Sequence, residues 1–360
     1  MEWLWTNEKQ WYDRWDTFND STGRGHYLQL SDWLFSYHVF GFETELLLGL
    51  ENGEICLGYG VIKVKYSLFK FCVINCGPII REGYESYLEE AINIFLNKSK
   101  REKAFYCHVC LPVMNEGSFP HGLPNAVLAP DSIFFSGSIG MLYKVVFSFG
   151  GFLWVNLEYI NSEEKLESFK ANTRRDIRAS LRKGLSMVEA ETYDQIREAY
   201  KAIEINAKEV GFVVRPWAEF KNYLLESHRK GFARFLMAYK DNDCKGVMLL
   251  LKVNRRYTYV MGGAKREKPD LLVGDFLQWN AMMIMMSEGM KGYDISWGGS
   301  KGVMDFKLSF DPTVYAYVQS RHWILSPTKF AIYSRLHPIL IKNKKTVVAT
   351  MKIIRKIIRN

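Results

Sequence analysis

A chain of 360 residues is longer than most single domains, so two domains are expected. A hydrophobic content of 48% and an aromatic content of 15% exclude a wholly disordered protein and are sufficient for packed cores. The net charge of +9 belongs to the C-terminal end, because ten Lys and Arg residues but no Asp or Glu follow residue 311, and the preceding residues are nearly neutral.

The first residues, MEWLWTNEKQWYDRWD, are aromatic but interrupted by charges, unlike a secretory signal peptide. The sequence contains no apolar run of about eighteen residues, the length that a membrane-spanning helix needs. We therefore expect a cytoplasmic protein.

Turn signals alternate with apolar runs in the first half of the chain, which predicts an α+β unit over residues 1–158. An Asn-Gly pair at 52–53 indicates a hairpin. The expected elements are an aromatic N-terminal helix, strands within 43–66, 70–80, 104–113, 141–149 and 152–158, and a helix over 85–100.

The second half predicts a similar unit over residues 159–325, followed by a tail over 326–360. Ser162 is the expected helix cap, and Gly184 ends that helical segment. The expected elements are helices within 161–184, 193–210, 216–230 and 274–290, and strands within 233–240, 245–253, 255–263 and 292–299. Because both halves combine helices with a mostly antiparallel sheet, the pattern is consistent with a duplicated α+β module.

Six cysteines occur, four of them in the segments FCVINC and YCHVC. Both segments lie in expected strands, and neither has a second pair elsewhere to complete a metal site. We expect reduced cysteines in the core and no metal, with a metal site as the alternative.

Five segments, in order along the chain, resemble motifs of the FemABX family of non-ribosomal peptidyltransferases, which are built from two GNAT-type acyltransferase domains. The segments are YLQLSDW (27–33), CGPII (76–80), NTRRDIRASLRKGLSMV (172–188), VVRPWAEFKNYL (213–224) and YDISWGGSKGVMDFKLSF (293–310). The resemblance extends over residues 25–322. It implies an α+β fold of two tandem GNAT-like domains with mixed, mostly antiparallel sheets flanked by helices, to which the charge pattern adds a basic helical tail.

The resemblance also implies transfer of an aminoacyl group from aminoacyl-tRNA to an amine of a nucleotide- or lipid-linked cell-envelope precursor, in peptidoglycan or a surface glycan. We expect a monomer that needs no cofactor beyond its co-substrate. The alternative is transfer from acyl-CoA to an amino sugar in surface polysaccharide synthesis. Acyl-CoA enzymes usually have an Arg/Gln-x-x-Gly-x-Gly/Ala loop before a helix, and its absence before residues 274–290 favours tRNA.

Lys307 follows a glycine-rich turn and lies between Phe306 and Leu308. The matching family lysine lies at the acyl-transfer site, so the resemblance implies a catalytic role for Lys307. An ammonium in a low-dielectric pocket stabilises the oxyanion that forms when an amine attacks an ester, and the two apolar neighbours are expected to exclude water. The alternative is a solvated lysine on a helix surface.

Arg215 precedes Pro216 at an expected helix start, where free backbone N–H groups favour anions. The resemblance implies that Arg215 contacts phosphates of the acceptor, and the alternative is a simple loop charge. The family's muropeptide enzymes have a lysine four positions after the tryptophan that matches Trp33. Here Tyr37 occupies that position, which argues against a nucleotide-linked muropeptide as acceptor.

Asp294 and Asp275 are candidates for interaction with the acceptor amine, which must lose a proton, and the alternative is a turn or cap role for either. Arg174, Arg178 and Arg182 recur every four residues and so share one helix face. This stripe is a candidate tRNA contact, or else an ordinary charged surface.

The tail segment TVVATMKIIRKIIRN places apolar and basic side chains on opposite sides of a helix. The apolar side comprises Val347, Met351, Ile354 and Ile358, and the basic side comprises Lys352, Arg355, Lys356 and Arg359. This pattern is typical of a helix on an anionic membrane surface. Packing onto the protein body and tRNA contact are the alternatives.

Overall fold

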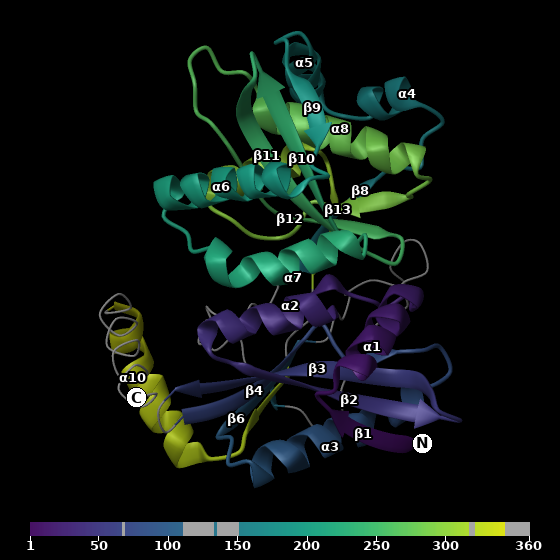
Figure 1. Cartoon of the computed structure of the whole chain (residues 1–360), viewed down its shortest axis with the longest axis vertical. Helices are drawn as coiled ribbons and strands as arrows, with labels where there is room; N and C mark the ends of the chain where they lie inside the picture. The colour runs from purple at the N-terminus through teal and green to yellow at the C-terminus, as the bar shows by residue number, and fades with distance from the viewer. Residues whose placement is uncertain (67–68, 111–132, 135–150, 317–320, 343–360) are drawn as a thin grey trace.

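The computed structural model describes residues 1–66, 69–110, 133–134, 151–316 and 321–342. The chain forms two halves, each a sheet covered by helices, with helices α2 (Ser31–Phe35) and α7 (Trp217–Arg229) between them (Figure 1). The expected α+β class is confirmed.

The first sheet belongs mainly to the N-terminal half. Its strands, in spatial order, are β1 (Glu2–Thr6), β2 (Glu43–Glu51), β3 (Glu54–Tyr66), β4 (Phe69–Asn75), β6 (Tyr106–Cys110), β15 (Arg321–Ile324) and β7 (Ile133–Phe134), and β5 (Ile79–Ile80) pairs with β3. Its helical segments are α1 (Lys9–Ser21), η1 (Tyr27–Gln29), η2 (Ser36–Phe40), η3 (Glu85–Tyr87) and α3 (Leu88–Arg101).

The second sheet belongs mainly to the C-terminal half. Its strands, in spatial order, are β14 (Thr313–Ala316), β8 (Gly151–Asn156), β13 (Gly292–Asp294), β12 (Arg256–Ala264), β11 (Asp243–Val253), β10 (Ala233–Lys240) and β9 (Ser186–Glu189). Its remaining helices are α4 (Ser162–Glu167), α5 (Ala171–Leu181), α6 (Tyr193–Val210), α8 (Val273–Ser287) and α9 (Lys301–Ser309).

The two halves repeat one topology. In the first half, antiparallel strands β2, β3 and β4 lead through α3 to β6, which pairs parallel with β4. In the second half, antiparallel strands β10, β11 and β12 lead through α8 to β13, which pairs parallel with β12. The repeated crossover supports the duplicated module inferred from the sequence.

Each sheet contains a strand from beyond the expected domain boundary. Strand β8 pairs with β13 and β14 of the second sheet, although the sequence assigned its residues to domain 1–158. Strand β15 pairs with β6 of the first sheet, although the sequence assigned its residues to domain 159–325. These pairings are non-local, and no local pattern reveals them.

Three local expectations differ from the structure. Strand β1 precedes helix α1, because residues Glu2–Thr6 pair with β2. The helical segment at 161–184 divides into α4 and α5, and the Asn161 side chain rather than Ser162 caps α4. The expected strand at 141–149 lies outside the described residues.

The main core cluster contains side chains from both halves, so the halves pack as one body. Helix α10 (Pro327–Lys342) lies beside the first sheet, where the Tyr333 ring lies 5.2 Å from the rings of Phe69 and Phe105 (Figure 1). The six cysteines are buried thiols without disulfides, as predicted. The amphipathic segment of the tail, residues 346–360, lies beyond the described part of the chain.

Candidate functional site

The Lys307 side chain points into the protein from helix α9, and only 5% of the residue is exposed. Helix α9 begins where the Ser300 side chain accepts a hydrogen bond from Val303 N–H. The Lys307 Nζ donates to the Ser296 carbonyl at 3.1 Å, the Ser296 hydroxyl at 2.8 Å and the Gly298 carbonyl at 3.1 Å. The alternative of a solvated surface lysine is therefore excluded.

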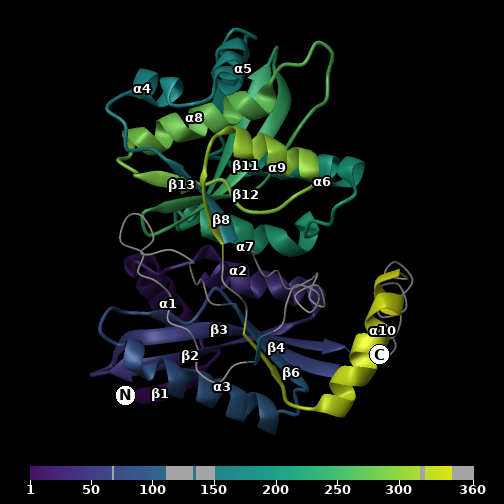
Figure 2. The same cartoon turned by 180° about the vertical axis from the view of Figure 1, so that it is seen from behind.

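The loop that receives this ammonium follows β13 and precedes α9 (Figure 2). Ser296, Gly298 and Gly299 have φ of +63°, +118° and +126°, a left-handed backbone that only glycine adopts readily. Strain of this kind at Ser296 recurs at functional sites, where the surrounding structure must maintain it. Here the left-handed turns bring two carbonyl groups to the ammonium.

Burial lowers the pKa of Lys307 to about 8, and the nearby Asp294 carboxylate opposes this shift. Asp294 is buried at the end of β13, and its Oδ1 accepts from Ser296 N–H at 2.8 Å and from Leu153 N–H at 3.3 Å. Burial also raises the pKa of Asp294. Asp294 therefore fixes the Ser296 loop and supplies the counter-charge nearest to Lys307.

Water exclusion around Lys307 differs from the expectation. Leu308 is 40% exposed, so it is itself in contact with solvent. The Tyr259 ring, 5.5 Å from Lys307 Nζ, covers the ammonium instead. All three N–H groups of the ammonium already have acceptors. To stabilise an oxyanion, the ammonium must therefore exchange one of these acceptors for the substrate oxygen.

Arg215 lies at the interface of the two halves, directly before helix α7. Its guanidinium carbon is 4.5 Å from the Trp33 ring centroid and 5.1 Å from that of Tyr37. The Tyr200 hydroxyl donates to the Arg215 carbonyl at 2.6 Å and fixes the backbone. The structure thus brings Arg215 and Tyr37 together at the interface of the two halves.

Several buried polar atoms surround the Tyr37 hydroxyl group. They are Trp33 Nε1, Arg215 Nε, and both side-chain polar atoms of Asn75. Polar contacts with these three side chains partly offset the burial that raises the pKa of Tyr37. Sequence reasoning missed Asn75, although the Cys-Gly-Pro motif beside it was a signal.

Tyr27, also missed, connects this cluster with the Lys307 region. Its ring lies 5.2 Å from the Trp33 ring in an edge-to-face arrangement. Burial and the Asp294 carboxylate raise the pKa of Tyr27, and the Arg215 guanidinium lowers it. One set of interacting charges therefore extends across the interface from Arg215 to Lys307.

Phe306 and Asp275 lie near the first turn of helix α8. A Cβ atom at Gly274 would be 3.0 Å from the Phe306 ring, so this ring covers the helix start. Burial raises the pKa of Asp275 to about 6, and Asp176 on α5 contributes to the shift. An aromatic ring and an acidic group therefore occupy the end of α8 that would otherwise attract an anion.

The arginine stripe on α5 is partly neutralised. Arg178 donates to Glu167 at 2.5 Å and to Glu163 at 3.1 Å, both on α4. Arg174 donates to the Phe169 carbonyl at 2.5 Å and also pairs with Glu167. Arg182 is the C-terminal cap residue of α5. A tRNA backbone on this face would have to displace carboxylates from Arg174 and Arg178.

Within the described ranges, no group of three or more His, Cys, Asp or Glu side chains is arranged to bind a metal ion. In the same part of the chain, no helix has the length and apolar character needed to span a membrane.

Comparison with known proteins identifies the fold. Residues 168–308 match a family model described as an acetyltransferase (GNAT) domain. No curated protein sequence matches the chain. Among solved structures, FemX is 16% identical with a TM-score of 0.69, and the alignment covers 92% of this chain and 99% of FemX.

Two further structures share the fold over most of their length. A conserved protein of unknown function from Bacteroides thetaiotaomicron VPI-5482 is 10% identical with a TM-score of 0.59, and the alignment covers 89% of this chain and 99% of that protein. L-PGS from Bacillus licheniformis is 11% identical with a TM-score of 0.53, and the alignment covers 91% and 96% of the two chains. The similarity includes both halves of the chain.

Proposed function

We propose that this chain, which has a FemABX-like double-GNAT fold, is an N-acyltransferase that joins an aminoacyl group to an amine of a cell-envelope precursor. The GNAT match and the shared fold support an acyltransferase. The observation that carries the proposed mechanism is the buried Lys307 ammonium, which lies in the GNAT half and next to Asp294.

In this mechanism, the acceptor amine attacks the ester carbonyl of the donor, and the C–N bond forms as the carbonyl oxygen becomes an oxyanion. The oxyanion replaces one loop oxygen as an acceptor for Lys307 Nζ. Because Lys307 is almost fully buried, the attraction between the ammonium and the oxyanion is stronger than in water. Collapse of the intermediate breaks the ester C–O bond, and the departing tRNA oxygen takes up the proton that the amine has released. Asp294 is the proposed acceptor of the amine proton, because burial raises the pKa of its carboxyl group.

The proposed donor is aminoacyl-tRNA. The start of α8 supports this choice over acyl-CoA, because the Phe306 ring and the Asp275 carboxyl group occupy the helix end where a pyrophosphate would need free N–H groups. The alternative donor, acyl-CoA with an amino-sugar acceptor, predicts that CoA rather than RNA accompanies the purified protein. Salt-sensitive co-purification of tRNA would support the proposed donor.

The proposed acceptor carries phosphate that interacts with Arg215. The support is the position of the guanidinium at the interface, together with the buried polar groups of Trp33 and Asn75 beside it. Tyr37 contributes a neutral hydroxyl at this cluster, so the anionic part of the acceptor faces one cation here.

The transfer assay uses tRNA charged with radiolabelled amino acids and a cell-envelope precursor extract as acceptor. Lys307→Met removes the ammonium and keeps a similar volume, and we expect it to lower the transfer rate by about 100-fold or more. Lys301→Met, at an exposed position on the same helix, is the matched control and should keep full activity. Equal activity of the two variants would contradict the role of Lys307.

The proposed location is the inner face of the cell membrane, with attachment through the basic tail. Each basic side chain near an anionic surface contributes about 1 kcal/mol. Deletion of residues 340–360 should therefore abolish co-sedimentation with anionic vesicles at low salt. Unchanged co-sedimentation after the deletion would contradict attachment through the tail.

A further inference from the structure

The loop between helices α6 and α7 exposes apolar side chains that the proposed reaction does not use. Val210, Phe212 and Val213 are 48%, 41% and 70% exposed. A single exposed apolar side chain is ordinary, but three within four residues form a patch of the kind that contacts a protein or a membrane. Residues 210–213 are called the apolar tip below.

The apolar tip is anchored at both of its ends. Helix α6 ends at Gly211, whose φ of +87° is a left-handed conformation that glycine adopts readily. The N–H groups of Gly211 and Phe212 donate to the Ala207 carbonyl at 2.9 Å and 3.0 Å. On the other side, Val214 packs against the main core. The fold therefore holds the apolar side chains of the tip in a fixed, exposed position.

Helix α10 exposes a second apolar surface on the same side of the molecule. The α6–α7 loop and α10 both lie on the left in Figure 1 and on the right in Figure 2. The outer face of α10 carries the exposed residues Lys329, Ile332, Arg335 and Leu336. They share one face because three or four positions separate them. Apolar and basic side chains are therefore mixed on this surface.

The charges beside both apolar surfaces indicate an anionic partner. Helix α10 contains Lys329, Arg335 and Lys342 but no Asp or Glu, and the sequence after it has none either. In residues 210–217 the single charged residue is Arg215. Apolar side chains with cations beside them suit the boundary between acyl chains and anionic headgroups. Protein interfaces, in contrast, are depleted of lysine.

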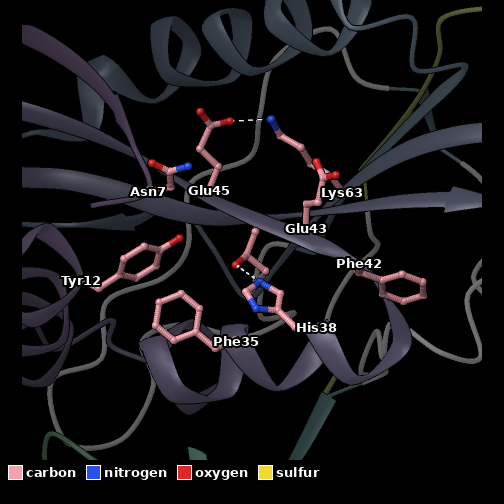
Figure 3. Close-up of a pocket in the computed structure, with 9 residues that line it drawn as sticks. Asn7, Tyr12, Phe35, His38, Phe42, Glu43, Glu45 and Lys63 are labelled. Atoms are coloured by element: carbon pink, nitrogen blue, oxygen red, sulfur yellow. Dashed lines mark hydrogen bonds and ion pairs between the residues drawn. The ribbon is translucent and has the colours of Figure 1, made fainter. Parts of the chain in front are cut away.

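Strand β2 begins near the apolar tip, because the Phe40 ring of the preceding η2 lies 5.8 Å from the guanidinium that follows the tip. Figure 3 shows Glu45 of β2 paired with Lys63, at 2.5 Å, and Lys98 lies 2.8 Å from the same carboxylate. Glu43 is a further, exposed carboxylate. These two acidic and two basic groups sum to zero charge, so the start of β2 does not repel an anionic surface.

We propose that the apolar tip enters an anionic lipid bilayer and that the outer face of α10 lies on its headgroups. This inference rests on the membrane location proposed above and assigns the face that contacts the lipid. A chain spans at most about 3.5 Å per residue, so the backbone of Arg215 lies within about 7 Å of that of Val213. With Val213 at the acyl boundary, Arg215 lies at the depth of the phosphates, where a lipid-linked acceptor presents its own phosphate.

The test attaches the environment-sensitive fluorophore nitrobenzoxadiazole to the apolar tip of the full-length protein. Val213→Cys provides the thiol, since the six native thiols are buried. On vesicles of equal parts phosphatidylglycerol and phosphatidylcholine, the emission should shift to shorter wavelength, and brominated lipid should quench it. The same label on Ile160→Cys, at a position that is 91% exposed just before α4, should show neither effect.

The outcomes separate this inference from the proposed location. Co-sedimentation of the protein with a label at position 213 that remains in water would overturn the proposed face and leave the location intact. Absence of co-sedimentation of the wild-type protein would contradict the location and this inference together. Shielding of the label before vesicles are added would identify a second copy of the chain as the occupant, which would also overturn the proposal.

A pair of double variants measures the contribution of the apolar tip to binding. Phe212→Ser with Val213→Ser should lower the affinity for the same vesicles about tenfold or more. Ile160→Ser with Leu181→Ser is the matched control, because it replaces exposed apolar side chains near α4 and α5 and should keep the affinity. Circular dichroism checks that both variants are folded, and equal affinities would refute contact through the tip.

Discussion

Burial of Lys307 has an energetic cost that depends on pH. Its pKa falls from an ordinary value of 10.5 to about 8 in the folded protein. Between these two values the unfolded chain holds a proton that the folded chain has released, so folding becomes more favourable as pH rises. The protein therefore retains a costly charge at neutral pH, as expected for a group that is kept for chemistry.

Wild-type protein should gain stability relative to Lys307→Met as pH rises from 8 to 9.5. The expected gain is about 2 kcal/mol, from about 1.4 kcal/mol per pH unit over this window. Urea unfolding of both proteins at pH 7.5, 8.5 and 9.5 measures it. A constant difference between the two proteins would show that the pKa of Lys307 is not lowered.

At the residue scale, the sequence could identify Lys307 through its motif, and Gly298 and Gly299 through the turn that they form. The roles of Asn75 and Tyr27 could not be predicted, because they depend on the approach of segments from the two halves.

At the scale of elements, the middle of α1, the start of α2 and the end of α7 meet in a buried charge cluster between the halves. The Lys230 ammonium, just after α7, lies 3.0 Å from Asp16 Oδ2 and 3.2 Å from Asp32 Oδ2. Burial raises the pKa of Asp32 to about 6, although the Lys230 charge opposes the shift. Two buried carboxyl groups thus share one cation across the interface.

Lys230→Met should destabilise the protein by about 3 kcal/mol at pH 7.5, because it leaves two buried carboxylates without a counter-ion. The loss should shrink at pH 5, since Asp32, with a pKa of about 6 or higher once the ammonium is removed, then takes up a proton. Urea unfolding followed by tryptophan fluorescence measures both values. The exposed Lys201→Met on α6 is the control, and an equal loss at both pH values would contradict this account.

Most helices and strands were predictable because their apolar spacing is local. Helix α6 has the predicted limits, with a Thr192 capping box before it and Gly211 after it. Strand β1 was missed because its pairing with β2 occurs over a sequence distance of about forty residues. Ion pairs such as Lys230 with Asp16 join residues that are even farther apart in the sequence, and no local pattern indicates them.

At the scale of the whole molecule, the second sheet is inserted between two strands of the first. The chain leaves the first sheet after β7, builds the second sheet from β8 to β14, and returns as β15 between β6 and β7. The first half is therefore discontinuous in sequence, although the repeated topology resembles two domains in tandem.

Fragment 151–316, which contains every described strand of the second sheet, should be better folded than fragment 159–325. The latter lacks β8, so β13 and β14 lose their shared partner. Near-ultraviolet circular dichroism and amide hydrogen exchange of the two fragments measure the difference. Equal protection in both would show that β8 contributes little to the second sheet.

The inserted topology also determines how the molecule responds to mechanical tension. Residues Glu2 and Lys342 both belong to elements beside the first sheet (Figure 1). Tension applied between these residues, for example in an optical trap, acts on the hydrogen bonds of β1 with β2 and of β15 with β6 and β7. The second half experiences no load until those bonds shear, so it should extend as a later, separate step.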